Sequence, residues 1–113
     1  VVARLKAFAE LFVDSSVNGR LPLCGALAAE LSALPDSLRE LTKKFFQMHI
    51  SWLEANLVIG QSQRVVREDL NPQEVSRAIL SSLEGGSFVS WALSDKVVDQ
   101  SGFSLILQNI IVS

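Results

Sequence analysis

The stretch NPQEVSRAILSSLEGGSFVSWALSD, residues 71–95, joins a strong helix start to two adjacent glycines. Asn71 is a favourable N-cap residue, Pro72 suits the first helical position, and Glu74 strengthens the start signal. Gly85 and Gly86 each cost about 1 kcal/mol relative to alanine inside a helix. The stretch therefore predicts a helix that tolerates this loss because another helix packs closely against it.

The small residues of this helix form a patch with apolar flanks. The patch and its flanks comprise Ser82, Leu83, Gly85, Gly86, Val89, Ser90 and Leu93. We expect two copies of the chain to meet there around a two-fold axis and form a four-helix interface. The alternative is that the glycines only relieve crowding inside one subunit.

The segment that follows, residues 96–112, favours self-association. It is expected to be helical and is apolar nearly all round, so it needs cover on both sides. Its expected interface residues are Phe103, Ile106, Leu107 and Ile110.

Three further helices are predicted upstream, over 2–13, 22–34 and 37–62, because apolar residues recur there at steps of three and four. Ser37 and Glu40 have the spacing of a capping box for the third, which at about 26 residues would span roughly 39 Å. Two runs are β-branched, at Val65–Val66 and in the last few residues, but both are too short to predict strands. We expect one all-α domain over residues 1–113, with about five helices.

The helix over 37–62 carries two apolar stripes. The long stripe is Leu38, Leu41, Phe45, Met48, Trp52, Ala55 and Ile59, and the second is Phe46, His49, Leu53 and Asn56. One stripe must pack on the core, and the other is available to line a cavity, since an apolar wall with a few polar groups suits a small molecule. Ordinary core is the alternative. The candidate effector-binding residues are Phe12, Cys24, Phe45, Met48, His49, Trp52, Leu53, Asn56, Phe88 and Trp91.

Composition argues against several classes of protein. The ten Lys and Arg residues are scattered and the net charge is -2, so the chain alone should bind nucleic acid poorly. The apolar runs are too short to span a membrane, and no signal peptide is visible. One histidine and one cysteine favour neither a metal site nor a catalytic set, and we expect no enzyme activity and no cofactor.

Cys24 has two interpretations. It would lie in the first turn of the helix over 22–34, where the helix dipole and Arg20 would favour the reactive thiolate form. The alternative is a buried small hydrophobe. A lone cysteine cannot form an internal disulfide, which suits a reducing cytoplasm.

Residues 23–63, LCGALAAELSALPDSLRELTKKFFQMHISWLEANLVIGQSQ, followed by residues 67–86, REDLNPQEVSRAILSSLEGG, resemble the C-terminal regulatory domain of TetR-type transcriptional regulators. The resemblance extends from Leu21 to about Leu93. Members of that family often carry glycine near Arg64, and the tail after Asp95 matches nothing specific in the family.

The resemblance implies a helical bundle that binds a small-molecule effector and forms a homodimer through its last two helices. It also implies a helix-turn-helix headpiece upstream, and the chain starts at Val1 inside a helical pattern. We therefore expect a fragment whose DNA contacts belong to a missing N-terminal domain. The alternative is a helical protein-protein interaction module without a ligand.

Overall fold

The computed structural model describes residues 1–17, 35–93, 95 and 99–112, with the side chains of 12–17 and 91 excepted. Its helices are α1 (Val2–Val17), α3 (Asp36–Ser62), α4 (Pro72–Ala92) and α5 (Ser101–Ile110). In these ranges the β pairing consists of one isolated antiparallel bridge, between Val66 and Ile111. The predicted all-α class is thus confirmed for the described residues, while the predicted helix over 22–34 lies outside them.

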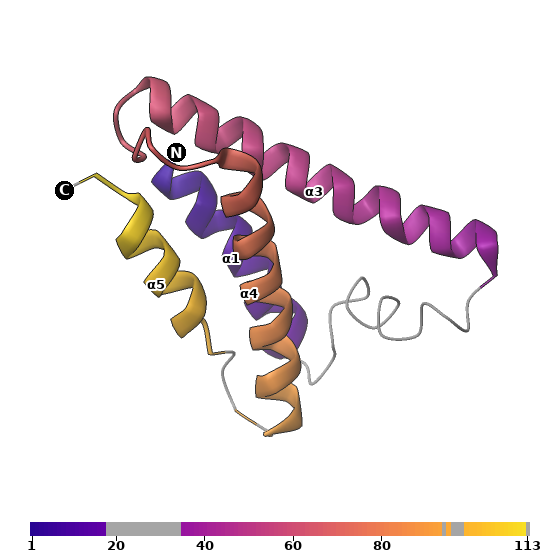
Figure 1. The fold of residues 1–113 in the computed structure, drawn as a ribbon. Helices are drawn as coiled ribbons and strands as arrows, with labels where there is room; N and C mark the ends of the chain where they lie inside the picture. Colours follow the sequence, from indigo (N-terminus) through magenta and orange to yellow (C-terminus); the bar gives the residue numbers. More distant parts are fainter. Residues whose placement is uncertain (18–34, 94, 96–98, 113) are drawn as a thin grey trace.

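The long helix α3 crosses one end of the group formed by α1, α4 and α5 (Figure 1). Its N-terminal half extends beyond the other described helices, and its C-terminal half packs on them. The core between the helices is apolar and comprises Leu5, Phe8, Ala9, Leu53, Leu57, Val66, Ile79, Leu80, Leu83, Phe103, Leu107 and Ile110. Each large side chain buried in this way stabilises the fold by about 1.5–3 kcal/mol before entropy is counted.

The helix bounds follow the sequence signals closely in the middle of the chain and less closely at its ends. Helix α3 has 27 residues, against about 26 expected, and α1 continues to Val17. Helix α5 begins at Ser101, later than expected, and just before it Asp99 Oδ1 accepts a hydrogen bond from Ser101 N. At the other end Ile111 is extended and leaves the helix to pair with Val66.

One of the two predicted caps is correct. Asn71 Oδ1 accepts hydrogen bonds from the backbone N–H groups of Gln73 at 2.9 Å and Glu74 at 3.3 Å, so the start of α4 is confirmed. The capping box at Ser37 is wrong. Helix α3 begins one residue earlier, after Pro35, and no side chain caps it. The acidic Asp36 in the first turn meets the positive end of the helix dipole instead.

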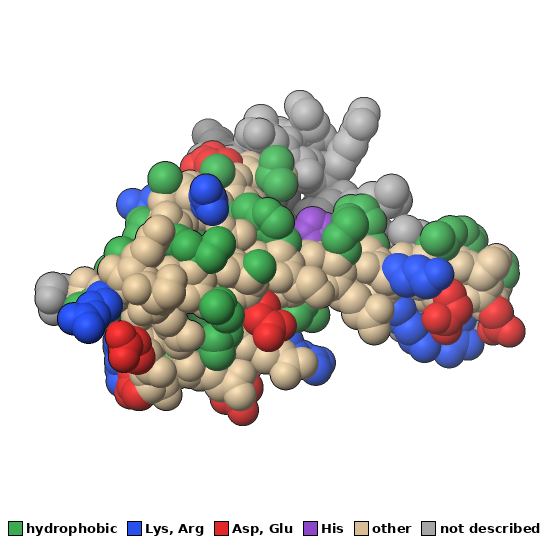
Figure 2. All heavy atoms as spheres, turned by 90° about the horizontal axis from the view of Figure 1, so that it is seen from above, with side chains coloured by type: hydrophobic (Ala, Val, Ile, Leu, Met, Phe, Trp, Pro, Cys, Tyr) green, Lys and Arg blue, Asp and Glu red, His purple; other side chains and the backbone are tan. Residues whose placement is uncertain are grey.

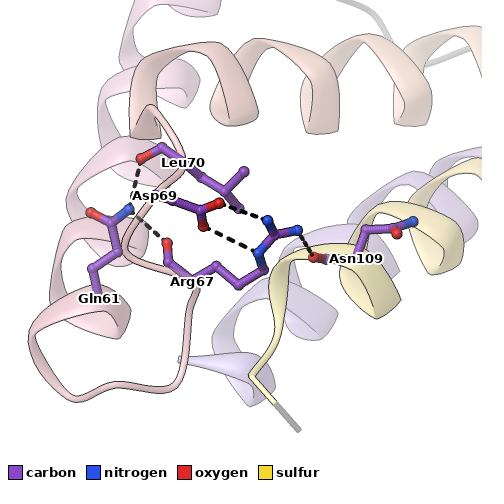
Figure 3. A network of polar contacts seen from close by, with 5 residues as sticks. All are labelled: Gln61, Arg67, Asp69, Leu70 and Asn109. Carbon is purple, nitrogen blue, oxygen red and sulfur yellow. Dashed lines mark hydrogen bonds and ion pairs between the residues drawn. The ribbon is translucent and has the colours of Figure 1, made fainter.

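The loop between α3 and α4 holds three helix ends together (Figure 3). Gln61 Nε2 donates to the carbonyl oxygens of Arg67 and Leu70, at 3.0 and 2.9 Å. The Arg67 guanidinium makes a two-point ion pair with Asp69, at 3.1 and 2.7 Å, and also donates to Asn109 O at the end of α5. The loop therefore fixes the C-terminal end of α5 against the start of α4.

Arg64, in the turn that ends α3, has a φ of 60°. This left-handed conformation costs a non-glycine residue roughly 1–2 kcal/mol, whereas glycine adopts it freely. We expect Arg64→Gly to raise the free energy of unfolding by about 0.5–1 kcal/mol, since glycine also loses more entropy on folding. Urea titration followed by circular dichroism would measure this, with Arg64→Ala as the control that keeps the strain. Equal or lower stability of the glycine variant would contradict the expectation.

Candidate functional site

A groove of about 530 Å³ lies between α1 and α3. Its described lining comes from one face of each helix and comprises Arg4, Ala7, Phe8, Leu11, Met48, His49 and Trp52. Figure 2 shows the histidine (purple) among hydrophobic side chains (green) on this side of the molecule. The groove has the size of a small-molecule site and is mostly apolar.

Aromatic rings build the floor of the groove. The ring of Phe8 stacks on Trp52, with centroids 5.4 Å apart and planes 18° from parallel. The rings of His49 and Phe8 make an edge contact with centroids 5.3 Å apart, and the centroid of Phe45 lies 4.6 Å from that of His49. These contacts fix the rings in place before any ligand binds, which reduces the entropy cost of binding.

Two polar groups stand in this apolar setting. Burial lowers the pKa of His49, so its imidazole is neutral at pH 7 and presents one donor and one acceptor. Arg4 Nη1 donates to Asn56 Oδ1 at 3.3 Å, and Asn56 Nδ2 in turn donates to the carbonyl oxygen of Trp52 at 2.9 Å. The described lining includes no carboxylate. The groove thus combines one permanent positive charge with a neutral imidazole.

The structure brings together only some of the predicted effector-binding residues. Met48, His49 and Trp52 line the groove, and Phe45 supports His49. Leu53 is fully buried in the core, so its assignment to the pocket is wrong. Asn56 is also buried, and it orients Arg4 instead of facing the groove. The side chains of Phe12, Cys24 and Trp91 lie outside the described residues.

We expected one stripe of α3 to face the core and the other to face a cavity. The structure does not follow this simple division. The second stripe turns Leu53 and Asn56 inward, while much of the long stripe is exposed, with Leu41 and Met48 each 61% exposed. Sequence reasoning also missed Arg4, Ala7, Phe8 and Leu11 on α1. Their spacing of three, one and three residues on one helical face was the available signal.

Phe88 belongs to a different pocket, between α3 and α4. This pocket has a volume of about 280 Å³ and is lined by Phe46, Ile50, Arg77, Leu80, Ser81, Glu84 and Phe88. Burial among these apolar side chains raises the pKa of Glu84 to about 7. One of its carboxylate oxygens is buried and accepts no hydrogen bond from a described residue. Glu84 therefore destabilises the folded chain at every pH at which its carboxyl group is ionised.

The small-residue patch of α4 makes its close contacts within the chain. A Cβ atom added to Gly86 would lie 2.8 Å from the carbonyl oxygen of Asp99, and Ser90 Oγ accepts a hydrogen bond from Asp99 N. Ser82 lies beside Gly102 of α5. Crowding inside one subunit thus explains Gly86, as the alternative interpretation held, whereas a Cβ atom at Gly85 would meet nothing within 4 Å.

The expectation that α5 needs a second chain for cover is also wrong for most of its residues. Phe103, Leu107 and Ile110 are buried against this chain's own core, as is Leu83 of α4. Ile106 is partly buried against the same core. The large apolar residues left exposed on the described parts of α4 and α5 and just after α4 are Val89, Leu93 and Leu105, and Gly85, four residues before Val89, is exposed as well.

Alanine at each glycine should separate the two roles. Gly85→Ala should raise the free energy of unfolding by about 0.5–1 kcal/mol, because the site is open and alanine is the better helix former. Gly86→Ala should lower it by about 1 kcal/mol, because the clash with the Asp99 carbonyl outweighs the same helix gain. Thermal and urea unfolding of both variants would measure this. Effects of the same sign would contradict the assignment of close contact to Gly86 alone.

Comparison with protein-family models, with curated proteins and with solved structures gave no match for this chain. The described residues form an all-helical arrangement with an apolar groove between α1 and α3. In the described part of the chain no helix combines the length and hydropathy that crossing a bilayer requires. The described residues also include no group of three or more His, Cys, Asp or Glu side chains placed to hold a metal ion.

Proposed function

We propose that this chain is the effector-binding and dimerisation domain of a TetR-type transcriptional regulator and works in the cytoplasm. The α1–α3 groove carries the proposal, because it offers an apolar, aromatic floor with two polar groups at a volume suited to a small molecule. The resemblance of residues 21–93 to that family supplies the regulatory role. A helical bundle of the family type would be completed by the predicted helix over 22–34.

The mechanism follows from which helices the ligand would touch. A ligand in the groove contacts α1 on Arg4 and Phe8 and α3 on Trp52, so it acts on the relative position of these helices. A headpiece attached ahead of Val2 would move with α1. In a dimer this movement changes the separation of two headpieces, which must match half-sites at a fixed spacing on DNA. The ligand acts through its different affinity for the two arrangements.

The proposed homodimer uses the face that α4 and α5 leave exposed, around Gly85, Val89 and Leu105. Light scattering on the eluted 113-residue chain should give twice the chain mass, and Val89→Glu should shift it to the monomer. A monomeric wild-type chain at micromolar concentration would remove the dimer from the proposal. A gel-shift assay with the full-length protein would then test regulation, and release of operator DNA by a groove ligand is the expected result.

A protein-protein interaction module without a ligand is the second candidate, and the exposed stripe of α3 favours it. Leu38, Leu41, Phe45 and Met48 follow heptad spacing and are all exposed. This candidate predicts that Leu41→Lys abolishes partner capture and leaves small-molecule binding unchanged. The regulator proposal predicts the reverse. A substitution that fills the groove, such as Ala7→Trp, should abolish small-molecule binding and leave partner capture unchanged.

A further inference from the structure

We propose that the α1–α3 groove selects amphiphilic monocarboxylates, with the carboxylate on Arg4 and the apolar body on Phe8 and Trp52. This inference rests on the proposed function, since it names the chemical class of the effector. It follows from three properties of the groove: a cation available at its edge, the lack of acidic groups in its described lining, and an aromatic floor.

The Arg4 guanidinium has capacity for an anion. It presents five N–H donors in a fixed fork, and its hydrogen bond to the amide oxygen of Asn56 is long, at 3.3 Å. No carboxylate of the described residues forms an ion pair with Arg4. The Asn56 amide, itself held by the Trp52 carbonyl, restrains the guanidinium near the groove. A carboxylate can accept two parallel hydrogen bonds from such a fork.

The charge balance of the groove disfavours a cationic ligand and favours an anionic one. Arg4 is its only charged described lining residue at pH 7, because burial keeps His49 neutral. An anion therefore meets attraction from Arg4 and no like charge in the described lining, and the neutral imidazole remains available as a hydrogen-bond donor. A protonated amine would instead be placed near Arg4 with no carboxylate of the described lining to pair with.

The remainder of the groove requires an apolar body on the ligand. Trp52 is partly exposed and offers aromatic surface that the buried ring of Phe8 supports from behind by stacking, and Met48 provides a flexible wall. A volume of about 530 Å³ accommodates a single aromatic ring with a short chain, or a medium-length alkyl chain. The ligand class is thus a small aryl-alkanoic or medium-chain alkanoic acid.

Isothermal titration calorimetry on the 113-residue chain tests the inference with two matched probe pairs. These are 4-phenylbutyrate with 4-phenylbutanamide, and octanoate with octanamide, in which only the charge of the head group changes. The variants are Arg4→Gln, Arg4→Lys and the control Lys6→Gln, which removes an exposed cation of α1 outside the groove. Circular dichroism of each variant checks that its helical content and melting temperature match those of the wild-type chain.

We expect each acid to bind the wild-type chain at least about tenfold more tightly than its amide, since charged hydrogen bonds are worth roughly 1.5–3 kcal/mol. Arg4→Gln should abolish this preference, Arg4→Lys should keep part of it, and Lys6→Gln should keep all of it. Higher salt should weaken binding of the acids only.

Two results overturn the inference in different ways. If acids and amides bind equally, and Arg4→Gln changes neither, the groove is a ligand site without selection for anions, and the proposed function stands. If no probe binds the wild-type chain at millimolar concentration, the groove takes no ligand of this class and the inference fails, whereas the proposed function is then judged by the light-scattering and gel-shift results.

Discussion

Phe103→Ala should lower the free energy of unfolding by about 3–5 kcal/mol, because a large aromatic ring is lost from a packed interior. Phe103 is 4% exposed and lies in the core between α5 and the rest of the chain. Removing its ring takes away apolar area and leaves a cavity that rigid helix backbones cannot fill. Urea denaturation followed by far-ultraviolet circular dichroism would measure the loss.

The matched control is Leu105→Ala on the same helix. Leu105 is 58% exposed in the single chain, so its loss should change stability by no more than about 0.5 kcal/mol. The Phe103 effect should also be the same at widely different protein concentrations, because its cover comes from the same chain. A loss that appears only at high concentration would instead place Phe103 in an interface between two copies.

Glu84→Gln should stabilise the protein at alkaline pH and have little effect in mild acid. Burial raises the pKa of this carboxyl group from 4.5 to about 7 in the folded chain. Between these values the folded state holds a proton that the unfolded state has released, so stability falls as the pH rises from about 4.5 to about 7. At higher pH than this range the stability stays at its lower value. Glutamine never ionises, so the variant escapes this loss.

The gain at about pH 8 should be roughly 1–2 kcal/mol. A full shift of this size corresponds to about 3 kcal/mol at 1.36 kcal/mol per pH unit, and we reduce it because solvent screens the partly exposed side chain. Melting temperatures of both proteins across the pH range would show the curves diverging on the alkaline side. The exposed Glu10→Gln serves as control and should leave the shape of the curve unchanged. Parallel curves for Glu84→Gln would mean that the carboxyl group is well solvated.

The start of α4 could be predicted from the sequence because it depends on neighbouring residues. Asn71, Pro72 and Glu74 act within one turn, and the hydrogen bonds from Gln73 and Glu74 to Asn71 follow. The recurrence of apolar residues at steps of three and four predicted α1 and α3 equally well, because this pattern also depends on residues that are close in the sequence. Leu5 and Phe8 of α1 are buried and follow the same steps of three and four, whereas Leu83, which we expected at a dimer interface, is buried in this chain's own core.

The orientation of α3 could not be predicted in the same way. Both of its stripes satisfy helical periodicity, and only the positions of α1 and α4 decide that Leu53 and Asn56 turn inward while Met48 is left at the groove. No local pattern indicates that the Asp99 carbonyl approaches Gly86, because that contact depends on how the chain returns from α4 to α5. The β-branched residues at 65–66 and 111–112 are visible as two short runs, but their pairing joins segments that lie far apart in the sequence.

Both described ends of the chain converge on Val66. The Val1 and Val66 side chains lie over Gly60, so close that a Cβ atom there would meet them at 3.1 and 2.5 Å. Ile111 also pairs with Val66 through an antiparallel bridge, and Figure 1 shows both termini near the loop between α3 and α4. A donor and an acceptor fluorophore attached to the two ends would therefore transfer energy efficiently in the folded chain. Loss of that transfer while helical ellipticity persists would report the detachment of this loop as a separate step.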